Sequence, residues 1–479
     1  MVQYVPVLAR AVEPMVQLSG PSELEALREA GARLSHRLRG GIVWNVNSTA
    51  HGGGVAELLR SLVGYARGVG VDCRWAVIGG DADFFLLTKR LHNAIHGAEG
   101  DDNMFDEAGR AVYERVSAAN AAELLSEVKS GDVVLLHDPQ TLGLAPTLAS
   151  CGAHVIWRCH IGADEPNDHF RAAYRFLAPY LKSVKTCVFT RAAYVPDELA
   201  GTNVHIVVPT IDPCATKNRE LTSEAARAIL VHTGLFEGPP PDALPEFTRS
   251  DGSVSRVNRA VDVIRLGRGY SRDMALIVQI SRWDRLKDHL GVLTGFARYV
   301  TNGGVARLLL AGPNVNAVAD DPEGAEVFNE VLAAYRALPH GVRVHVGLAN
   351  LPMADAEENA AIVNALQREA TVIVQKSLKE GFGLTVAEAM WKAKPVIASR
   401  VGGIQDQIEH GVSGILLDNP RDYDAFAAAL KLLCADPPYA AMLGTNARAR
   451  ARERFLSLRS LYAYAELIGD LLERGSIAR

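Results

Sequence analysis

The sequence predicts an α/β protein of two doubly wound domains, each a parallel sheet with helices on both faces. Short apolar runs typical of buried parallel strands alternate with amphipathic helical segments along most of the chain. The alternation breaks once, near residues 209–213, which divides it into two series of about six strands each. A length of 479 residues also suits two or three domains.

The first series follows a helical segment at residues 22–38, where leucines recur at helical spacing behind Pro21. Helical segments separate several of its strands, as in repeated βα units. We place this domain at residues 1–212. Its strands are predicted at residues 42–46, 73–78, 133–136, 155–159, 186–189 and 204–208.

The second series follows a helix at residues 223–234 and a polar, proline-rich segment at 238–258, which we interpret as a surface loop. We place this domain at residues 213–455, and we expect a C-terminal helix at 456–479 to pack back on the first domain. The strands of the second series are predicted at residues 275–280, 306–311, 342–346, 371–374, 396–398 and 414–417.

Composition excludes several classes of protein. The net charge of −5 gives no basic excess for nucleic acid, and no apolar run reaches 18 residues, so neither a nucleic-acid partner nor a membrane span is expected. The N-terminus lacks the pattern of a secretory signal. Six scattered cysteines without a CxxC pair indicate reduced thiols, and we expect a cytoplasmic protein. Whether it forms a homodimer stays open.

The loops after the strands are the places to search for chemistry, because ligands of open parallel sheets bind beyond the carboxyl ends of strands. One such loop reads EGFGLTVAEAM at residues 380–390. Gly381 and Gly383 let a ligand approach the backbone, and the first amides of the following helix form an anion site. Two carboxylates, Glu380 and Glu388, lie eight residues apart and could reach one pocket.

Less specific interpretations of this loop stay open. Thr385 and Glu388 also match a capping box, in which the glutamate bonds back to a backbone N–H. Glu380 alone could be a solvated loop acid. Gly402 and Gly403, before a later helix, predict a turn that could also line the pocket.

Two further loops suit phosphate groups. Three glycines at residues 52–54 lead into an amphipathic helix, although they could serve only a tight turn. Arg282 and Lys287 frame another helix start, so both cations could reach one phosphate. The alternative for this pair is a surface ion pair with Asp284 or Asp288.

Two loops of the first domain suit sugar hydroxyls. Asp138 and Gln140 follow a strand, with Pro139 favouring an extended or turn backbone at Asp138, and the alternative is an Asx turn or helix cap. His160 follows the next strand and could bind a hydroxyl or be structural. A nucleophilic pair with Cys159 is disfavoured because neighbours on a strand point to opposite faces, and no zinc-ligand spacing is present. Together these loops fit a cleft for an activated sugar diphosphate.

These motifs resemble those of a known family. The strings KEGFGLTVAEAM at 379–390, KPVIAS at 394–399 and SR-x4-K at 281–287 resemble the EX7E and Arg/Lys elements of retaining GT-B glycosyltransferases of family 4. The strings VNST-x2-GGGVAE at 46–57, HDPQ at 137–140 and WRCHI at 157–161 look like those of trehalose glycosyltransferring synthases and trehalose phosphorylases. The resemblance runs from about residue 41 to 455 and implies two Rossmann-like domains facing a central cleft.

The resemblance also implies residue roles. It implies no cofactor and no metal for the chemistry, and the DXD at residues 81–83 is interpreted as chance. For the donor, the resemblance implies that Glu380 binds the sugar hydroxyls, Glu388 the ribose, and Arg282 and Lys287 the phosphates. Gly53 and Gly54 would lie against the diphosphate, His160 would contact the donor glucose, and further donor contacts would come from Gly381, Phe382, Gly383 and Leu384. Asp138 and Gln140 would bind the acceptor sugar.

The function implied is transfer of glucose from a nucleoside diphosphate glucose, such as UDP-glucose or ADP-glucose, to the anomeric hydroxyl of glucose, which yields trehalose with retention. Three alternatives remain: a trehalose phosphorylase, a family 4 transferase with another acceptor, and an inactive sugar-nucleotide sensor. A dehydrogenase is disfavoured because no strand is followed by GxGxxG with an acidic residue about 20 residues later.

Overall fold

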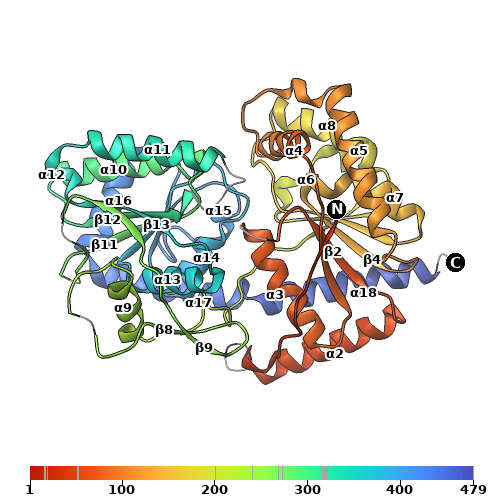
Figure 1. Ribbon diagram of the computed structural model, residues 1–479, viewed down its shortest axis with the longest axis horizontal. Helices are drawn as coiled ribbons and strands as arrows, with labels where there is room; N and C mark the ends of the chain where they lie inside the picture. Colours follow the sequence, from red (N-terminus) through yellow and green to blue (C-terminus); the bar gives the residue numbers. More distant parts are fainter. Residues whose placement is uncertain are drawn as a thin grey trace. The chain divides into compact units, whose positions relative to one another are not determined.

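The computed structural model describes residues 1–15, 18, 20–50, 53–199, 201–239, 241–267, 269–271, 273–315 and 322–477. The chain divides into two compact units (Figure 1). Unit 1 comprises Met1–Asp212 and Phe455–Arg479, and unit 2 comprises Pro213–Arg454. In Figure 1, unit 1 runs from red to yellow with the blue helix α18, and unit 2 runs from green to blue.

Unit 1 is built on a seven-stranded sheet in the order β1-β3-β2-β4-β5-β6-β7. Neighbouring strands are parallel except at one edge, where β1 runs antiparallel to β3 with Gln3 opposite Val77. The strands are β1 (Gln3–Val5), β2 (Val43–Asn47), β3 (Cys73–Val77), β4 (Val133–His137), β5 (His154–Cys159), β6 (Thr186–Phe189) and β7 (Asn203–Ile206).

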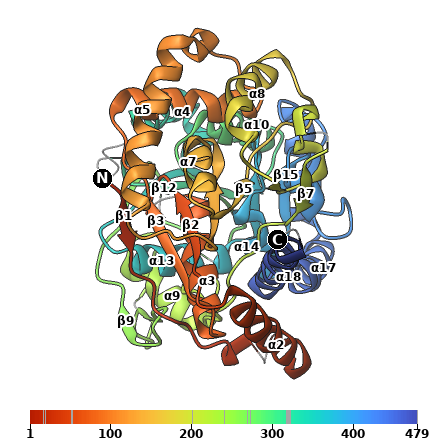
Figure 2. The ribbon, with the colours of Figure 1, turned by 90° about the vertical axis from the view of Figure 1, so that its right-hand side faces the viewer.

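Helices cover both faces of this sheet (Figure 1). The final helix packs against α2 and α3, and Figure 2 also draws it beside α2. The helices are α2 (Pro21–Leu38), α3 (Gly54–Gly68), α4 (Ala82–Ile95), α5 (Glu107–Leu124), α6 (Asp138–Thr141), α7 (Ala145–Ser150), α8 (Asp168–Leu181) and α18 (Ser457–Ile477).

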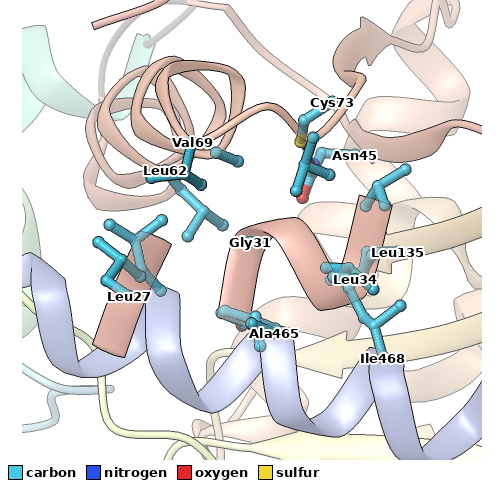
Figure 3. Close-up of a pocket in the computed structure, with 15 residues that line it drawn as sticks. Leu27, Gly31, Leu34, Asn45, Leu62, Val69, Cys73, Leu135, Ala465 and Ile468 are labelled. Atoms are coloured by element: carbon cyan, nitrogen blue, oxygen red, sulfur yellow. Dashed lines mark hydrogen bonds between the residues drawn. The ribbon is translucent and has the colours of Figure 1, made fainter. Parts of the chain in front are cut away.

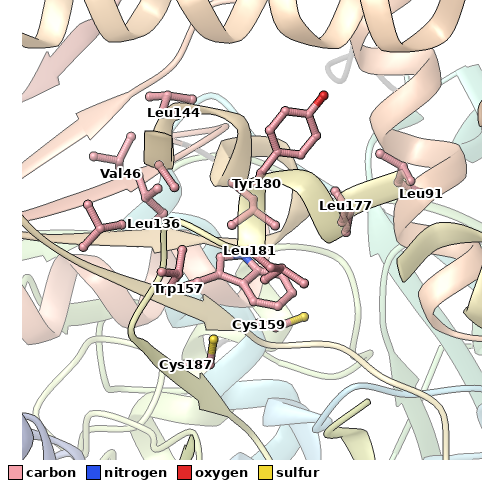
Figure 4. Close-up of a cluster of buried hydrophobic side chains, with 14 of the residues drawn as sticks. Val46, Leu91, Leu136, Leu144, Trp157, Cys159, Leu177, Tyr180, Leu181 and Cys187 are labelled. Carbon is pink, nitrogen blue, oxygen red and sulfur yellow. The ribbon is translucent and has the colours of Figure 1, made fainter. Parts of the chain in front are cut away.

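The two faces of this sheet differ in how tightly apolar side chains pack against it. Under α2, α3 and α18 lies a small apolar cavity of about 40 Å³, with Asn45 as a polar group in its wall (Figure 3). On the other face Val46, Leu136 and Trp157 pack against α8 without exposed area (Figure 4). The burial of these side chains supplies the main driving force for folding this unit.

Unit 2 repeats the architecture with a seven-stranded sheet in the order β10-β13-β12-β11-β14-β15-β16. Again one edge strand, β10, is antiparallel to its neighbour. The strands are β10 (Asp262–Arg265), β11 (Leu276–Ile280), β12 (Arg307–Pro313), β13 (Val346–Leu351), β14 (Val372–Gln375), β15 (Val396–Ser399) and β16 (Ile415–Leu417). A separate antiparallel hairpin joins β8 (Glu246–Thr248) to β9 (Val254–Arg256).

The helices of unit 2 lie on both faces of its sheet, with α10 and α11 on one face and α13 and α14 on the other (Figure 1). They are α9 (Ser223–His232), α10 (His289–Thr301), α11 (Pro322–Ala337), α12 (His340–Arg343), α13 (Ala356–Glu369), α14 (Leu384–Trp391), α15 (Ile404–Gln407), α16 (Tyr423–Ala435) and α17 (Pro437–Arg454). None of the described helices is both long and apolar enough to span a membrane.

Three sequence predictions about elements were wrong in detail. Of the strand expected at residues 342–346, the first two residues end helix α12, and pairing with β12 begins only at Val346, which lies opposite Leu308. The sheets contain seven strands rather than about six, because the antiparallel edges β1 and β10 were missed. The segment interpreted as a surface loop contains the hairpin β8–β9.

The strand orders place the ligand-binding edge of each sheet. In unit 1 the chain leaves β2 for β3 on one side and then crosses to β4 on the other, and in unit 2 the order reverses in the same way between β11 and β14. Ligands of such sheets bind outside the carboxyl ends of the strands at this reversal. The loops after β2, β4, β11 and β14 are therefore the candidate site of each unit.

Candidate active site

In unit 2, Arg282 and Lys287 both lie in the loop that follows β11. Asp284 begins a short 3-10 helix at Arg285–Lys287, and its Oδ1 accepts a hydrogen bond from the backbone N–H of Leu286 at 2.8 Å. Its Oδ2 accepts from Nη2 of Arg282 at 3.1 Å, so one of the ion pairs considered from the sequence does form. The Arg282 side chain nonetheless remains 47% exposed, which leaves it accessible to an anion.

Lys287 joins the loop after β11 to the loop after β14. Its Nζ lies 2.6 Å from Oε2 of Glu380, and that oxygen also accepts from Oγ of Ser377 at 3.1 Å. Glu380 is only 11% exposed, so it is not a solvated loop acid. Gln279 in β11 donates to the backbone carbonyl of Lys287 at 2.9 Å and fixes the approach of the lysine. Lys287 and Glu380 thus join the two loops at the carboxyl edge of this sheet, and Arg282 lies in the first of these loops.

A buried ion pair supports this loop, and sequence reasoning missed it. Lys376, directly after β14, is fully buried and pairs with Asp288, which excludes the alternative pairing of Asp288 with Lys287. Asp288 has a left-handed φ of 54° and caps α10 through the backbone N–H of Gly291 at 3.1 Å. Burial lowers the pKa of the Lys376 ammonium, against the opposing effect of Asp288.

The glycine loop before α14 leaves the helix N-terminus without a side-chain cap. Gly383 is the N-cap with φ of 85°, a conformation that favours glycine. The capping box considered from the sequence does not form, because Oγ1 of Thr385 donates to Gln375 at 3.0 Å. The amides at Leu384 and beyond can therefore meet an anion.

Two residues of the next helix hold the glycine loop. Nε2 of Gln407 donates to the carbonyl of Phe382 at 2.5 Å, and the N–H of Gly403 donates to the carbonyl of Gly381 at 3.1 Å. A Cβ on Gly403 would lie 2.8 Å from Cα of Phe382, so the close contact requires glycine there. Gly403 therefore packs against the glycine loop, and Gln407 is a supporting residue that the sequence analysis did not identify.

Glu388 belongs to a separate, buried network. It is 2% exposed, its Oε1 lies 3.4 Å from Nζ of Lys217, and its Oε2 accepts from Nε2 of Gln367 at 3.3 Å. Nζ of Lys392 donates to Oε1 of the same glutamine at 2.6 Å, which orients the amide. Burial lowers the pKa of Lys392 to about 7, opposed by the charge of Glu388. The structure thus buries this carboxylate more deeply than that of Glu380.

In unit 1, the loop after β2 ends at the N-terminus of α3. Gly53 is the N-cap with φ of 88°, and Gly54 is the first helical residue. No atom lies within 4 Å of a Cβ built on Gly53, so it is the backbone conformation, rather than crowding, that favours glycine. Gly52 lies outside the described residues. Both observed glycines leave the amides of this helix start open for an anion.

Asp138, after β4, departs from the expected backbone. It has φ of 62°, in the left-handed region, rather than the extended or turn conformation predicted before Pro139. Its Oδ1 accepts from the backbone N–H of His160 at 2.8 Å, which joins the ends of β4 and β5 instead of capping a local turn. Burial raises the pKa of the Asp138 carboxyl to about 6, against the opposing effects of that hydrogen bond and of the Arg158 cation. Such strain concentrates at functional sites.

His160 lies against a second histidine. Its Nε2 is 2.9 Å from Nδ1 of His137, and the rings are stacked with 14° between their planes. Nε2 of His137 in turn lies 3.1 Å from Oδ1 of Asn45. Burial lowers the pKa of His137 to about 3 and that of His160 well below its usual value, helped in both by the nearby Arg158 cation. His137 was missed in the sequence, where only its place at a strand end marked it.

The remaining residues singled out in unit 1 differ in their surroundings. Oε1 of Gln140 is buried without a hydrogen-bond partner among the described residues, so it could accept from a ligand. Burial raises the pKa of the Cys159 thiol far above its usual value, which makes it a poor nucleophile. Asp81 of the DXD caps α4 through the N–H of Phe84 at 3.0 Å and pairs with Arg115. The described part of the chain brings together no three His, Cys, Asp or Glu side chains suited to a metal.

Comparison with known proteins identifies the family of the two units. The family model described as trehalose synthase, N-terminal domain, matches residues 45–196, and that of glycosyl transferases group 1 matches residues 270–450. A trehalose synthase of Rubrobacter xylanophilus is 35% identical over 441 residues, which are 92% of each chain. A trehalose phosphorylase of Pleurotus pulmonarius is 24% identical over 414 residues, 81% of this chain and 52% of the other.

Among solved structures, a UDP-forming α,α-trehalose-phosphate synthase from Burkholderia xenovorans superposes with a TM-score of 0.64. The match covers 90% of this chain and 98% of the other at 16% identity, so it shows the fold alone. That fold is the GT-B arrangement of two parallel-sheet α/β domains expected from the sequence motifs. With the family models and the trehalose synthase of Rubrobacter xylanophilus, it follows that the chain belongs to the trehalose synthase branch of the GT-B glycosyltransferases of family 4.

Proposed function

We propose that the protein is a retaining glycosyltransferase that moves glucose from a nucleoside diphosphate glucose to the anomeric hydroxyl of glucose, forming trehalose reversibly. One observation carries the proposal. Lys287 pairs with Glu380 at the carboxyl edge of the unit 2 sheet, near the uncapped N-terminus of α14, and Arg282 lies in the same loop as Lys287. Two cations, a carboxylate and open amides suit the phosphates and hydroxyls of a sugar nucleotide.

The donor site would stabilise the charge that develops during transfer. As the bond between the anomeric carbon and the diphosphate breaks, negative charge grows on the leaving oxygen. Arg282 and Lys287 placed near that oxygen would each contribute a few kcal/mol of transition-state stabilisation, about as much as an oxyanion-hole donor. The amides of α3 behind Gly53 would add to the binding of the diphosphate. We propose that these groups replace a catalytic metal.

The acceptor site would bind a neutral sugar. Asp138 supplies a carboxylate, Gln140 a buried amide oxygen without a partner in the described chain, and His160 a neutral imidazole. Hydroxyl groups are donors that such oxygens and nitrogens can accept. The carboxylate of Asp138 can orient the acceptor, and His160 can contact the donor glucose near the reacting carbon.

No carboxylate is left over to act as a nucleophile in this scheme. Glu380 accepts hydrogen bonds from Lys287 and Ser377 and would bind sugar hydroxyls. We therefore infer same-face attack. The acceptor oxygen forms its bond to the anomeric carbon as the carbon–phosphate oxygen bond breaks, and the departing phosphate oxygen takes the acceptor's proton. The configuration at the donor carbon is then retained.

A panel of nucleoside diphosphate glucoses with free glucose tests this proposal. The expected product is α,α-trehalose with release of a nucleoside diphosphate, identified by NMR and chromatography. Glucose attached to another acceptor, or nucleotide binding without turnover, would contradict it.

A trehalose phosphorylase is the second candidate, because the chain is similar to the phosphorylase of Pleurotus pulmonarius. Inorganic phosphate would then occupy the position of the leaving diphosphate. Incubating trehalose with either phosphate or a nucleoside diphosphate distinguishes the two. Release of glucose 1-phosphate would identify a phosphorylase, and formation of a nucleoside diphosphate glucose would identify the synthase.

A further inference from the structure

Three polar side chains form a chain of hydrogen bonds behind the sugar-binding edge of unit 1. His160 bonds to His137, and His137 bonds to Asn45 in β2. The proposed transfer reaction gives His137 and Asn45 no role, and both side chains are only 1% exposed. We propose that Asn45 and His137 are positioning residues that set the tautomer of His160, so that its Nδ1 is an unprotonated acceptor for a substrate hydroxyl. The substrate part of this inference rests on the proposed function.

The first step is that both rings are neutral. His137 and His160 are buried side by side, and a proton on either would place a second cation near Arg158. Asp138 is the nearby acid, and its Oδ1 bonds to the backbone N–H of His160. A neutral imidazole carries one proton, on Nδ1 or on Nε2, and the partners decide which.

The second step follows the protons along the chain. Oδ1 of Asn45 is an amide oxygen and can only accept, so Nε2 of His137 carries the proton and donates at 3.1 Å. Nδ1 of His137 is then bare and can only accept. Nε2 of His160, 2.9 Å away, must therefore carry the proton and donate. This leaves Nδ1 of His160 without a proton.

The third step concerns what that nitrogen can meet. The backbone N–H of His160 donates to Asp138, its carbonyl accepts from the hydroxyl of Thr190, and its Nε2 bonds to His137. Nδ1 has no hydrogen-bond partner in the part of the chain that the structure describes, and it is not among the fully buried unpartnered atoms. It is thus placed to accept a hydrogen bond from a hydroxyl, which would discriminate against groups unable to donate.

The orientation of Asn45 is the origin of the whole chain. Its Nδ2 donates to Sγ of Cys73 at 3.3 Å, and beside it lies the cavity lined by Leu34, Leu62 and Leu135 among others (Figure 3). The bond from Nδ2 to Sγ of Cys73 directs the amide oxygen toward His137. A rotated amide would reverse every proton in the chain and place a donor at Nδ1 of His160.

Long-range 1H–15N spectra of the histidine side chains test this without substrate. In the wild-type protein we expect His137 and His160 as neutral Nε2–H tautomers at pH 7.5. His96 is an internal control, because its Nδ1 lies 3.1 Å from the carbonyl of Gly162 and must carry the proton. Detection of His160 as the Nδ1–H tautomer, or as an imidazolium, would overturn the inference.

His137→Phe removes the acceptor that holds the proton on Nε2 of His160. We expect the His160 signals to move toward a mixture of tautomers while His96 is unchanged. With nucleoside diphosphate glucose and glucose, kcat/KM should fall by about tenfold, the size of one lost hydrogen bond. An unchanged His160 tautomer in this variant would refute the positioning role, and if the variant does not fold, the wild-type spectrum decides alone. A protein inactive on every sugar nucleotide, but with the expected spectrum, would instead count against the proposed function.

Discussion

The sites of unit 1 and unit 2 occupy the same place in two similar sheets but are built from different chemistry. In unit 1, the neutral His160–His137–Asn45 chain lies beside Asp138, with the buried Arg158 cation nearby. In unit 2, the site is a set of ion pairs, with Lys287 on Glu380 and Arg282 on Asp284. Strand order alone gives both units a binding edge.

The difference teaches what each edge is suited to hold. A buried network of neutral side chains disfavours a further unpaired charge, which is costly in a low-dielectric site, and it recognises hydroxyl groups by its pattern of donors and acceptors. Cations already paired with carboxylates can instead reorganise toward a ligand that brings its own negative charge. The proposed division is therefore a neutral acceptor sugar in unit 1 and a sugar nucleotide in unit 2.

Removing a cation of unit 2 should have the largest effect. Arg282→Ala is expected to lower kcat/KM by roughly 100-fold or more, through loss of a contact to the leaving phosphate. Steady-state kinetics with nucleoside diphosphate glucose measures this. Arg285→Ala is the matched control, because Arg285 lies three residues away and pairs with Glu330 at 2.8 Å. Near wild-type rates for Arg282→Ala would remove it from the site.

The second largest effect on activity is expected from neutralising the carboxylate of Glu380 in unit 2. Glu380→Gln keeps the shape but weakens the pairing with Lys287, and we expect kcat to fall by about tenfold to 100-fold with the melting temperature little changed. Kinetics and circular dichroism on the same preparation separate turnover from folding. Full activity in this variant would refute the role of Glu380 in binding the donor sugar.

The pH dependence of kcat/KM tests the role of Asp138 in the unit 1 site. Its pKa is raised to about 6, so the carboxylate is ionised above that pH, and kcat/KM for the acceptor should fall as the pH drops below about 6. Asp138→Asn should lower the plateau by about tenfold or more and abolish this acid limb. The exposed Asp168, changed to Asn, is the control. An acid limb that persists in Asp138→Asn would assign it to another group.

The same carboxyl carries a stability prediction. Because the folded-state pKa is raised above the unfolded value, its contribution favours the folded state at low pH and is lost as the pH rises through about 6. At pH 7.5, Asp138→Asn should therefore be at least as stable as the wild type in thermal unfolding. A clear loss of stability would mean that the carboxylate serves folding rather than binding.

The smallest effects are expected at the DXD of unit 1. Asp81→Ala removes the cap of α4 and should lower the denaturant midpoint slightly without changing kcat/KM. Asp83→Ala should change neither quantity. Denaturant unfolding and kinetics check both, and a loss of activity that added Mn²⁺ reverses would show that the motif binds a catalytic metal.

The sequence predicted the parts that repeat a simple pattern. Central strands such as β4 and β11 are buried on both faces and read as continuous apolar runs. The missed antiparallel edge strand β1 gives no such signal, because it has exposed or half-buried residues only. The run at residues 342–346 contains alternating valines, but Val342 is buried as part of helix α12 and the ladder starts at Val346.

Candidate site residues were found where one loop carries the whole motif, as at Glu380 and Arg282. Partners that arrive from distant parts of the sequence were not. Lys376 meets Asp288 across 88 residues, and His137 meets Asn45 across 92. The left-handed backbone of Asp138 was also not predictable, because Pro139 favours other conformations and the compensating hydrogen bond comes from His160, 22 residues away.

Calorimetric titration tests most directly whether nucleotide binding depends on unit 2 and not on unit 1. A nucleoside diphosphate is titrated into the wild-type protein, Arg282→Ala and Asp138→Asn. We predict that Arg282→Ala raises the Kd by about tenfold or more, while Asp138→Asn leaves it unchanged. Loss of nucleotide affinity in Asp138→Asn, with normal affinity in Arg282→Ala, would contradict the account.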